Sequence, residues 1–146
     1  MSGDSILLRC KGCKAINRVP ADRLKEHPIC GNCKTPLEFT NKAIHGTSAN
    51  FKEEVLEWPG IAVVEFWAKW CGACRLMAQV LDQLAAERAG RLKVVTIEVD
   101  EETNLSGHFQ IKSTPTFILY QNGRKVNEIA GSLNKSQLET WIDGSL

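Results

Sequence analysis

The feature that most constrains this chain is its six cysteines, which fall into three pairs of identical Cys-x-x-Cys spacing. Two of the pairs lie close together near the N-terminus, and the third stands alone near the middle of the chain. The pairs are Cys10 with Cys13, Cys30 with Cys33, and Cys71 with Cys74. The sequence therefore contains an N-terminal cluster of four cysteines and one isolated pair, and the two groups need separate explanations.

Length and composition limit the possible classes of protein. The chain has 146 residues, enough for one ordinary domain or for a small domain plus a very small one. Its hydrophobic content of 43% and charged content of 24% are typical of a soluble globular protein. A net charge of +1 gives no basis for electrostatic binding to nucleic acid or to an anionic membrane, and the longest strongly apolar run, residues 61–68, is too short to span a bilayer. We expect neither a nucleic-acid partner nor a membrane.

The N-terminal sequence bears on the compartment. It has no basic region before its short Ile-Leu-Leu run, so we expect no secretory signal and a cytoplasmic location. In a reducing cytosol, cysteines serve more often as metal ligands or catalytic groups than as structural disulfides.

Three segments of the chain differ in composition. Residues 1–39 are rich in cysteine, lysine and turn formers, and they are too short to fold on a hydrophobic core alone. Residues 40–47 are polar and contain one glycine, which is typical of a linker. Residues 48–146 alternate between helical and strand patterns. We expect a small N-terminal module, a linker and an α/β domain.

Within the α/β domain, Asn50 and Glu53 have the spacing of a capping box, which predicts a helix through about residue 57. The longest helix is expected over 71–88, on apolar residues at helical spacing, which are Leu76, Met77, Val80, Leu81 and Leu84. The other expected elements are strands over 61–68, 92–99, 116–120 and 125–129, a short helix over 102–109, and a last helix capped by Asn134 or Ser136. This order predicts a mixed sheet with helices on both faces.

The isolated pair lies between a buried strand and the start of a helix, which is typical of a redox-active pair. A helix N-terminus lowers the pKa of a cysteine placed there, so Cys71 is expected to be exposed and partly ionised. Cys74 follows one helical turn later, close enough to form a disulfide. Cys71 would attack a substrate disulfide, and Cys74 would then resolve the mixed disulfide. A metal half-site or an inert buried pair is the alternative, although no second pair or histidine follows to complete a metal site.

Residues 48–146 resemble the thioredoxin family over the whole domain, through VVEFWAKWCGAC, STPTFILYQNGRKV and AGSLNKSQLETWI in the family's order and spacing. The resemblance implies a thioredoxin fold, with Cys71 as the nucleophile and Cys74 as the resolving cysteine. It also implies a cis-proline at Pro115, which faces the pair and leaves the backbone of Thr114 free to pair with a substrate segment. The residues that it places around the same groove are Trp70, Gly72, Ala73 and Gly131. From the sequence alone, Pro115 is equally well an ordinary turn proline.

The sequence departs from the family pattern at three positions. Ala73 replaces the usual proline between the cysteines, and because proline pre-organises an early helical position, we expect an altered redox potential, with a more oxidising value favoured. Glu65 replaces the family's buried aspartate beneath the pair. If Glu65 is buried, its carboxyl has a raised pKa and can accept the proton of Cys74; an exposed strand edge is the alternative. Thr96 stands where the family often has a lysine, so a charge pair with that carboxylate is missing.

The four N-terminal cysteines have the spacing of a tetrahedral zinc site, Cys10-x2-Cys13-x16-Cys30-x2-Cys33. Four thiolates close the coordination shell, which indicates a structural metal without an open catalytic position. The binding free energy, roughly 10–16 kcal/mol in small zinc peptides, would supply the stability that this segment lacks. Gly12 and Gly31 are expected to ease the two turns around the metal. Two disulfides, or iron in a tetrathiolate site, are the alternatives.

A zinc ribbon ahead of a thioredoxin domain resembles the bacterial thioredoxin 2 group, and this resemblance covers nearly the whole chain. It implies one zinc ion, reduction by thioredoxin reductase with NADPH, and protein disulfides as substrates; we expect a monomer. The sequence therefore predicts a protein-disulfide reductase that carries electrons in cell redox homeostasis, with a structural or regulatory zinc module. The alternatives are a zinc ribbon that binds nucleic acid or protein on a thioredoxin platform, and a redox-regulated chaperone.

Overall fold

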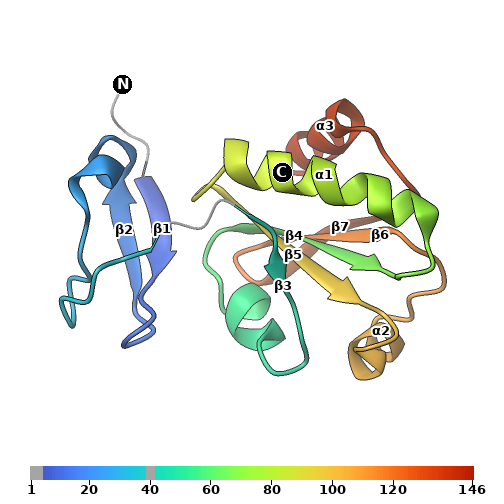
Figure 1. Ribbon diagram of the computed structural model, residues 1–146, viewed down its shortest axis with the longest axis horizontal. Coiled ribbons are helices and arrows are strands. Elements are labelled where there is room, and N and C mark those ends of the chain that lie inside the picture. Colours follow the sequence, from blue (N-terminus) through green and yellow to red (C-terminus); the bar gives the residue numbers. More distant parts are fainter. Residues whose placement is uncertain (1–4, 39–41) are drawn as a thin grey trace.

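The computed structural model describes residues 5–38 and 42–146 of the chain. Figure 1 shows a small N-terminal module beside a larger domain that is built on a central sheet. Among the described residues, no helix is both long enough and apolar enough to cross a membrane.

The N-terminal module is an antiparallel pair of strands followed by a short helix. β1 (Ser5–Arg9) pairs with β2 (Ile16–Pro20), and a 3₁₀ helix covers Ala21–Glu26. The apolar core of the module consists of three buried side chains, Ile6, Leu8 and Val19. Such a small core cannot offset the entropy lost when the segment is ordered, so the module needs further stabilisation.

The sheet of the larger domain has five strands in the order β3–β5–β4–β6–β7. β5 pairs in parallel with both β3 and β4, whereas β6 pairs antiparallel with both β4 and β7. The strand bounds are Ile44–His45 for β3, Ile61–Trp67 for β4, Leu92–Glu98 for β5, Thr116–Gln121 for β6 and Arg124–Ala130 for β7. The mixed sheet predicted from the sequence is therefore confirmed.

The first strand of this sheet lies inside the segment expected to be a linker. Residues 39–41 lie outside the described residues, but Ile44 and His45 pair with Val95 and Thr96 of β5. Strand pairing of the larger domain therefore begins within residues 40–47.

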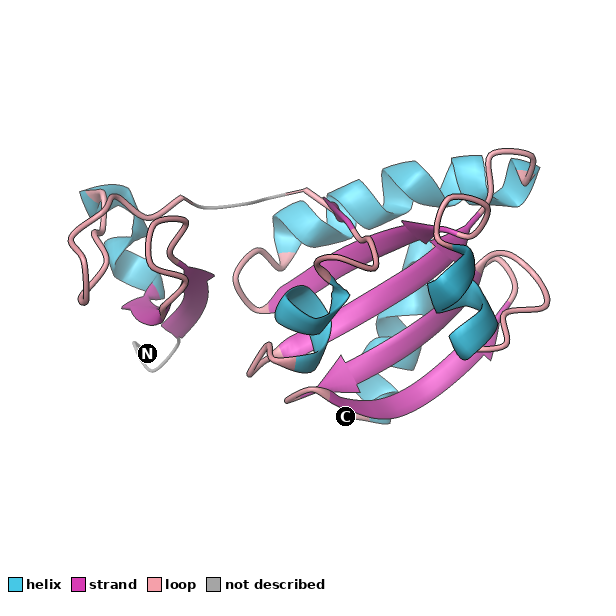
Figure 2. Cartoon of the chain, turned by 90° about the horizontal axis from the view of Figure 1, so that it is seen from below, coloured by secondary structure: helices cyan, strands magenta, loops and turns pink. Residues whose placement is uncertain are grey.

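Helices cover both faces of the sheet. One face carries α1 (Gly72–Glu87) and α3 (Lys135–Ser145), and the other carries α2 (Thr103–His108) and a short π-type helix at Lys52–Leu56 (Figures 1 and 2). Because side chains alternate along a strand, the sheet contributes apolar side chains to one cluster on each face. The helices predicted from the sequence are all present.

Helix α1 matches its expected range closely, but one expected core residue is exposed. Met77, Leu81 and Leu84 are buried at helical spacing, as predicted. The prediction for Leu76 is wrong, because this residue is 76% exposed, and Ala85 is buried on the face toward the sheet instead. Leu76 and Leu81 are five residues apart, which is about 140° around a helix, so one face cannot include both.

The two predicted helix caps have different outcomes. The capping box expected at Asn50 and Glu53 is wrong, because Asn50 forms reciprocal hydrogen bonds with Thr47 instead. The Asn50 side chain accepts from the N–H of Thr47 at 2.7 Å, and the N–H of Asn50 donates to the Thr47 hydroxyl at 3.3 Å. At the last helix the cap is Asn134. Its side chain accepts from the N–H of Gln137 at 2.8 Å, and the Gln137 side chain accepts from the N–H of Asn134 at 3.0 Å.

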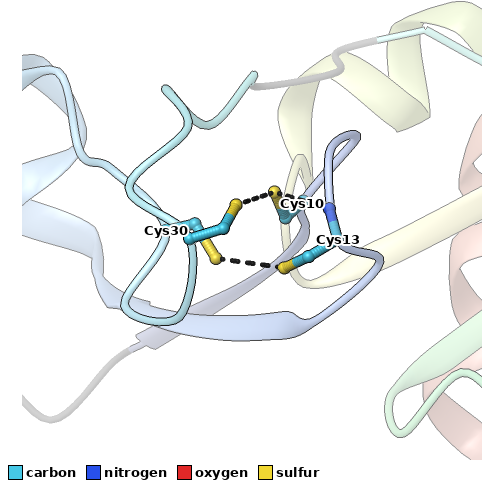
Figure 3. A group of neighbouring side chains, drawn as sticks. Cys10, Cys13 and Cys30 are labelled. Atoms are coloured by element: carbon cyan, nitrogen blue, oxygen red, sulfur yellow. Dashed lines mark hydrogen bonds between the residues drawn. The ribbon is translucent and has the colours of Figure 1, made fainter.

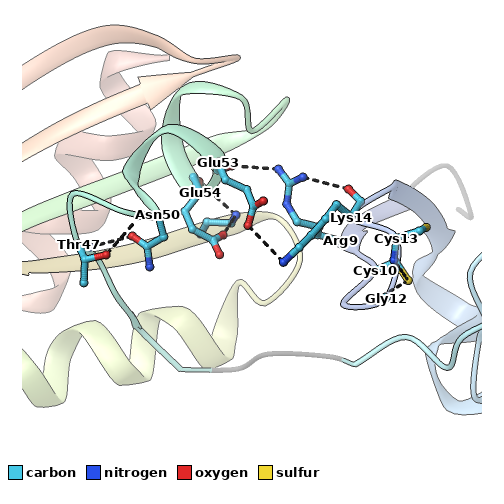
Figure 4. Close-up of polar contacts among 10 residues, drawn as sticks. Arg9, Cys10, Gly12, Cys13, Lys14, Thr47, Asn50, Glu53 and Glu54 are labelled. Carbon is cyan, nitrogen blue, oxygen red and sulfur yellow. Dashed lines mark hydrogen bonds and ion pairs between the residues drawn. The ribbon is translucent and has the colours of Figure 1, made fainter.

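The N-terminal module contacts the larger domain at the loop after α1 and at the Lys52–Leu56 helix. The backbone N–H of Leu7 lies 3.5 Å from the carbonyl oxygen of Gly90. The guanidinium of Arg9 donates hydrogen bonds to the carbonyl oxygens of Lys14, at 3.0 Å, and Glu53, at 2.9 Å (Figure 4). Arg9 therefore connects a cysteine turn of the module to the larger domain.

This contact lies at the opposite end of α1 from the isolated cysteine pair. Cys71 precedes the first residue of α1, whereas Gly90 follows its last turn. α1 has 16 residues. At about 1.5 Å per residue its ends are separated by roughly 24 Å. The N-terminal module is therefore remote from Cys71.

Candidate functional site

Cys71 and Cys74 form a disulfide at the N-terminus of α1, with Cα atoms 5.3 Å apart. Cys71 is the N-cap residue, and its sulfur accepts a hydrogen bond from the backbone N–H of Cys74 at 3.2 Å. Cys71 is 7% exposed and Cys74 is 3% exposed, so the expectation of an exposed Cys71 is corrected for the disulfide form. In the reduced form, the N–H groups and the dipole of α1 would stabilise a thiolate at Cys71.

The strand before the pair explains how the disulfide is held in place. β4 is central in the sheet, and it is buried along almost its whole length. After β4 ends at Trp67, the N–H of Cys71 donates to the carbonyl oxygen of Ala68 at 3.1 Å, which turns the chain directly into α1. The pair therefore lies between a rigid strand and a rigid helix.

A second loop faces the disulfide. The Thr114–Pro115 peptide bond is cis, as the resemblance implied, and the carbonyl oxygen of Thr114 lies 3.6 Å from the sulfur of Cys71. The N–H of Gly131 donates to the carbonyl oxygen of Pro115 at 2.9 Å. Gly131 has a φ of +109°, a conformation that favours glycine, and there is open space beside it. The structure thus brings these three residues to one side of Cys71.

The remaining predicted groove residues surround the disulfide on its other side. The Trp70 side chain is 70% exposed, and its indole N–H donates to a carboxylate oxygen of Asp100 at 3.0 Å. Gly72 is exposed, with open space where a Cβ would lie, whereas Ala73 packs against the buried cluster of Ala68, Cys71 and Cys74. A flat, exposed tryptophan next to a reactive sulfur is suited to contact another protein.

Glu65 lies beneath the pair and is buried. Its side chain is 2% exposed, so the exposed-edge alternative is wrong. Burial raises the pKa of the Glu65 carboxyl from 4.5 to about 8. The residue paired with Glu65 on β5 is Thr96, where the family often has a lysine. The pKa of Glu65 is therefore raised by burial, without a neighbouring lysine to lower it. Glu65, Thr96 and Cys74 line one pocket of about 490 Å³.

The four N-terminal cysteines converge at the end of β1 and β2 (Figure 3). Their sulfurs all lie within 4.8 Å of one another; Cys10 and Cys33 are 3.5 Å apart, and Cys13 and Cys30 are 3.6 Å apart. Four thiolates at the ordinary zinc–sulfur distance place neighbouring sulfurs about 3.8 Å apart in a tetrahedron. The donor set and its spacing therefore fit one zinc ion.

The two cysteine turns repeat the same backbone geometry. In the first turn the N–H of Lys14 donates to the carbonyl oxygen of Cys10, and in the second the N–H of Lys34 donates to that of Cys30, both at 2.9 Å. Lys14 and Lys34 each have a φ of +68°. The left-handed positions of the two turns are therefore occupied by lysines and not by the expected glycines, whereas Gly12 gives room at the site, because a Cβ there would lie 2.9 Å from Oγ1 of Thr35.

Backbone N–H groups donate to two of the sulfurs, and at Cys30 the donors favour the thiolate form. The N–H of Gly12 donates to Cys10 at 3.3 Å, and the N–H of Asn32 donates to Cys30 at 3.3 Å. The backbone N–H of Cys33, followed by the side-chain amide of Asn17, lowers the pKa of the Cys30 thiol to about 6. Metal ligation requires deprotonated thiols, so these contacts suit a metal centre.

An acidic turn that was not predicted from the sequence contacts the site. Asp100, Glu101 and Glu102 begin two positions after the last residue of β5, and they are the only run of three acidic residues in the sequence. Asp100 accepts the hydrogen bond from Trp70, and Glu101 lies 3.1 Å from the ammonium of Lys69. The acidic run was available as a signal, but only the fold shows that it faces the residues before Cys71.

A helix-capping disulfide after a central strand, with a cis-proline loop against its first sulfur, defines the class of dithiol–disulfide oxidoreductases. The sequence model described as Thioredoxin matches residues 42–144, and the model described as Thioredoxin 2, N-terminal, matches residues 9–35. The chain belongs to the thioredoxin family, as its sequence motifs predicted, and it carries the N-terminal zinc ribbon described for thioredoxin 2.

Individual relatives agree with this assignment. The chain is 36% identical over 100 residues to a thioredoxin of Rickettsia felis, which covers 68% of this chain and 95% of that protein. It is 37% identical over 100 residues to thioredoxin 1 of Synechococcus elongatus, with 68% and 94% covered. It is 33% identical over 143 residues to thioredoxin C-3 of Corynebacterium nephridii, with 97% and 96% covered. That last similarity includes the N-terminal module.

Proposed function

We propose that this chain reduces disulfides in other proteins, with Cys71 as the attacking sulfur and Cys74 as the resolving sulfur. The Cys71 thiolate attacks one sulfur of a client disulfide, forms a mixed disulfide and releases the other client sulfur as a thiolate, which takes up a proton. The Cys74 thiolate then attacks Cys71, releases the second client sulfur and leaves the pair oxidised. Two electrons pass from the pair to the client.

Glu65 is the proposed proton acceptor for Cys74. A thiol attacks only after it has lost its proton, and Cys74 is too buried to pass that proton directly to bulk water. The Glu65 carboxyl lines the same pocket as Cys74, and its raised pKa lies close to that of a thiol. Near neutral pH it can therefore accept the proton and release it again.

The client is proposed to lie in the groove beside Cys71. The carbonyl of Thr114 and the open space at Gly131 suit an extended backbone segment on one side. The exposed indole of Trp70 supplies apolar contact on the other. Gly72, Ala73 and Pro115 complete the groove.

The oxidised pair must be reduced again before the next turnover. We propose that a thioredoxin reductase supplies the two electrons, as the family assignment suggests, and that the cycle takes place in the cytoplasm. One chain supplies every residue of the site, so we propose that a monomer is the working form.

The four-cysteine centre is proposed to hold one zinc ion in a structural role. Cys10, Cys13, Cys30 and Cys33 would occupy all four positions of a tetrahedral ion. Bound zinc would link the two cysteine turns and so stabilise a module whose own apolar core is small.

This proposal rests on the surroundings of the Cys71 sulfur. The N–H of Cys74 lies 3.2 Å from it, and the carbonyl oxygen of Thr114, in the cis-proline loop, lies 3.6 Å from it. The test is a redox titration of the zinc-loaded protein in dithiothreitol buffers, combined with insulin reduction, with Cys71→Ser as the control. A two-electron transition at a reducing potential, lost in the control, is the expected result. A protein that shows no transition and leaves insulin oxidised would overturn the proposal.

A further inference from the structure

The last residue of β5, Glu98, is a buried carboxylate that the proposed mechanism does not use. Its side chain is 1% exposed. One carboxylate oxygen accepts a hydrogen bond from the N–H of Glu101 at 2.7 Å, and its backbone carbonyl accepts from the N–H of Glu102 at 2.9 Å. Glu98 therefore closes the acidic turn with both its side chain and its backbone.

The same acidic turn holds the residues that lead into the disulfide. Asp100 accepts the 3.0 Å hydrogen bond from the indole of Trp70. Glu101, whose N–H is held by Glu98, forms the 3.1 Å ion pair with Lys69. Lys69 and Trp70 immediately precede Cys71, so the turn contacts the chain on the two positions next to the reactive sulfur.

Glu98 carries a cost in the folded state. Its second carboxylate oxygen is buried and, among the residues that the structure describes, has no hydrogen-bond partner. A buried polar atom without a partner destabilises a fold, and an apolar side chain of similar size would avoid that cost. The benefit of a carboxylate at this position therefore comes from its other oxygen, which accepts the hydrogen bond from Glu101 and so fixes the acidic turn.

We propose that Glu98 is a positioning residue that fixes the Trp70 indole beside Cys71 through the acidic turn. This inference rests on the proposed role of Trp70 in contacting client proteins. A protein client covers the surface around Cys71, whereas a small disulfide needs only access to the sulfur. A mobile indole would therefore weaken the binding of the protein client more than the binding of the small disulfide. Glu98 thus acts on the choice between protein and small-molecule disulfides, while the dithiol chemistry is left intact.

The test compares two substrates, insulin and the small aromatic disulfide DTNB, with the zinc-loaded full chain and dithiothreitol as electron donor. Glu98→Met removes the acceptor and keeps the volume. We expect it to raise KM for insulin roughly threefold to tenfold, the range for one lost hydrogen bond, without changing the DTNB rate. Glu98→Gln keeps an acceptor oxygen and should restore the insulin KM. Ile142→Val, a core change in α3, is the control for general loss of stability.

A double-mutant cycle with Trp70→Ala separates positioning from general damage. If Glu98 acts through the indole, Glu98→Met adds no further increase in the insulin KM once Trp70 is alanine. An equal increase in both backgrounds, a parallel loss with DTNB, or failure of glutamine to restore KM would each overturn the inference. Reduction of insulin by the unchanged protein tests the proposed function separately.

A measurement on the unchanged protein covers the case in which Glu98→Met does not fold. The amide of Glu101 should exchange with solvent as slowly as the amides of the neighbouring strand β5, because Glu98 holds it. Rapid exchange at Glu101 would contradict the inference.

Discussion

The backbone N–H of Cys74 donates a 3.2 Å hydrogen bond to the sulfur of Cys71 across the first turn of α1. The helix end therefore stabilises negative charge on Cys71, while Cys74 lies one turn inside the helix and is 3% exposed. This asymmetry gives the two sulfurs different roles, although they share one sequence motif.

We expect Cys71→Ser to abolish insulin reduction and Cys74→Ser to trap clients. Without Cys71 there is no attacking thiolate, whereas without Cys74 the mixed disulfide forms and cannot be resolved. Non-reducing gels of a cell extract that has been incubated with each variant measure the covalent adducts. Adducts on the Cys71→Ser protein, at the level seen with Cys74→Ser, would reverse the assignment of the two sulfurs.

The buried Glu65 carboxyl should make the stability of the protein fall as the pH rises. Its pKa is 4.5 when unfolded and about 8 when folded, so the folded state binds the extra proton between these values. Its contribution is therefore complete below pH 4.5 and is lost as the pH rises through about 8. The expected slope is about −1.4 kcal/mol per pH unit within that window.

Urea unfolding at several pH values measures this slope, and Glu65→Gln should remove it. Glu57→Gln, at an exposed position, is the matched control and should leave it unchanged. The same Glu65→Gln change is expected to slow resolution of the mixed disulfide, because the proton acceptor for Cys74 is lost. A slope that persists in Glu65→Gln would show that another group binds the proton.

Ala73→Pro should move the redox midpoint to a more reducing value. Ala73 is the second residue of α1, where proline is tolerated. Alanine leaves the segment more freedom than proline does, and the reduced form can use that freedom more fully than the cross-linked form. A difference of about 0.4–1 kcal/mol corresponds to about 10–20 mV for a two-electron couple. Equilibration with glutathione measures it, and an unchanged midpoint would show that position 73 does not set the potential.

The sequence was sufficient for the reactive cysteines because their chemistry is local. Cys71 and Cys74 lie within one turn of a helix whose start follows from the preceding apolar strand, and the spacing of the other four cysteines predicted their cluster. Glu65 could be placed in the interior because apolar residues surround it in the sequence. The inferences on Cys71, Cys74 and Glu65 depend on neighbours within a few positions, whereas the four-cysteine cluster depends on two Cys-x-x-Cys pairs separated by 16 residues.

The wrong or missing expectations concern either two competing local signals or contacts between distant segments. The N-cap expected at Asn50 is displaced because Thr47, three residues earlier, offers a competing cap. Leu76 has an apolar side chain, but the placement of α1 on the sheet leaves it in solvent. The acidic turn reaches Trp70 only through the pairing of β4 with β5, which brings together residues 30 positions apart.

Gly90→Ala is expected to release the N-terminal module from the larger domain. Gly90 has a φ of +79°, and a Cβ there would lie 1.8 Å from Cγ2 of Ile6. The left-handed backbone alone costs a non-glycine residue about 1–2 kcal/mol, and the overlap can be relieved only by moving Ile6. Amide exchange of β1 should become faster, while the Cys71 midpoint stays the same. Gly107→Ala, which has open space around it, is the control and should change neither.

Zinc removal should unfold the module and leave the dithiol intact. Within residues 5–38, three buried side chains form the apolar core of the module, so the linkage between the two cysteine turns is its main source of stability. The module contacts the larger domain at Gly90, at the opposite end of α1 from Cys71, and at Glu53, which is not among the residues around the disulfide, so loss of the module does not alter the surroundings of the Cys71 sulfur.

Chelation followed by amide exchange tests both statements in one sample. The chain should release one zinc, and the amides of residues 5–38 should lose their protection from exchange. The amides of the strands in the larger domain should stay protected, and the DTNB rate should stay within about twofold. The full chain carrying Cys10→Ser serves as a second route to the metal-free state without a chelator. If the module stayed protected without metal, the structural role of zinc would be excluded. If the DTNB rate fell when zinc was removed, the four-cysteine centre and the Cys71–Cys74 pair would be coupled along α1 despite their separation.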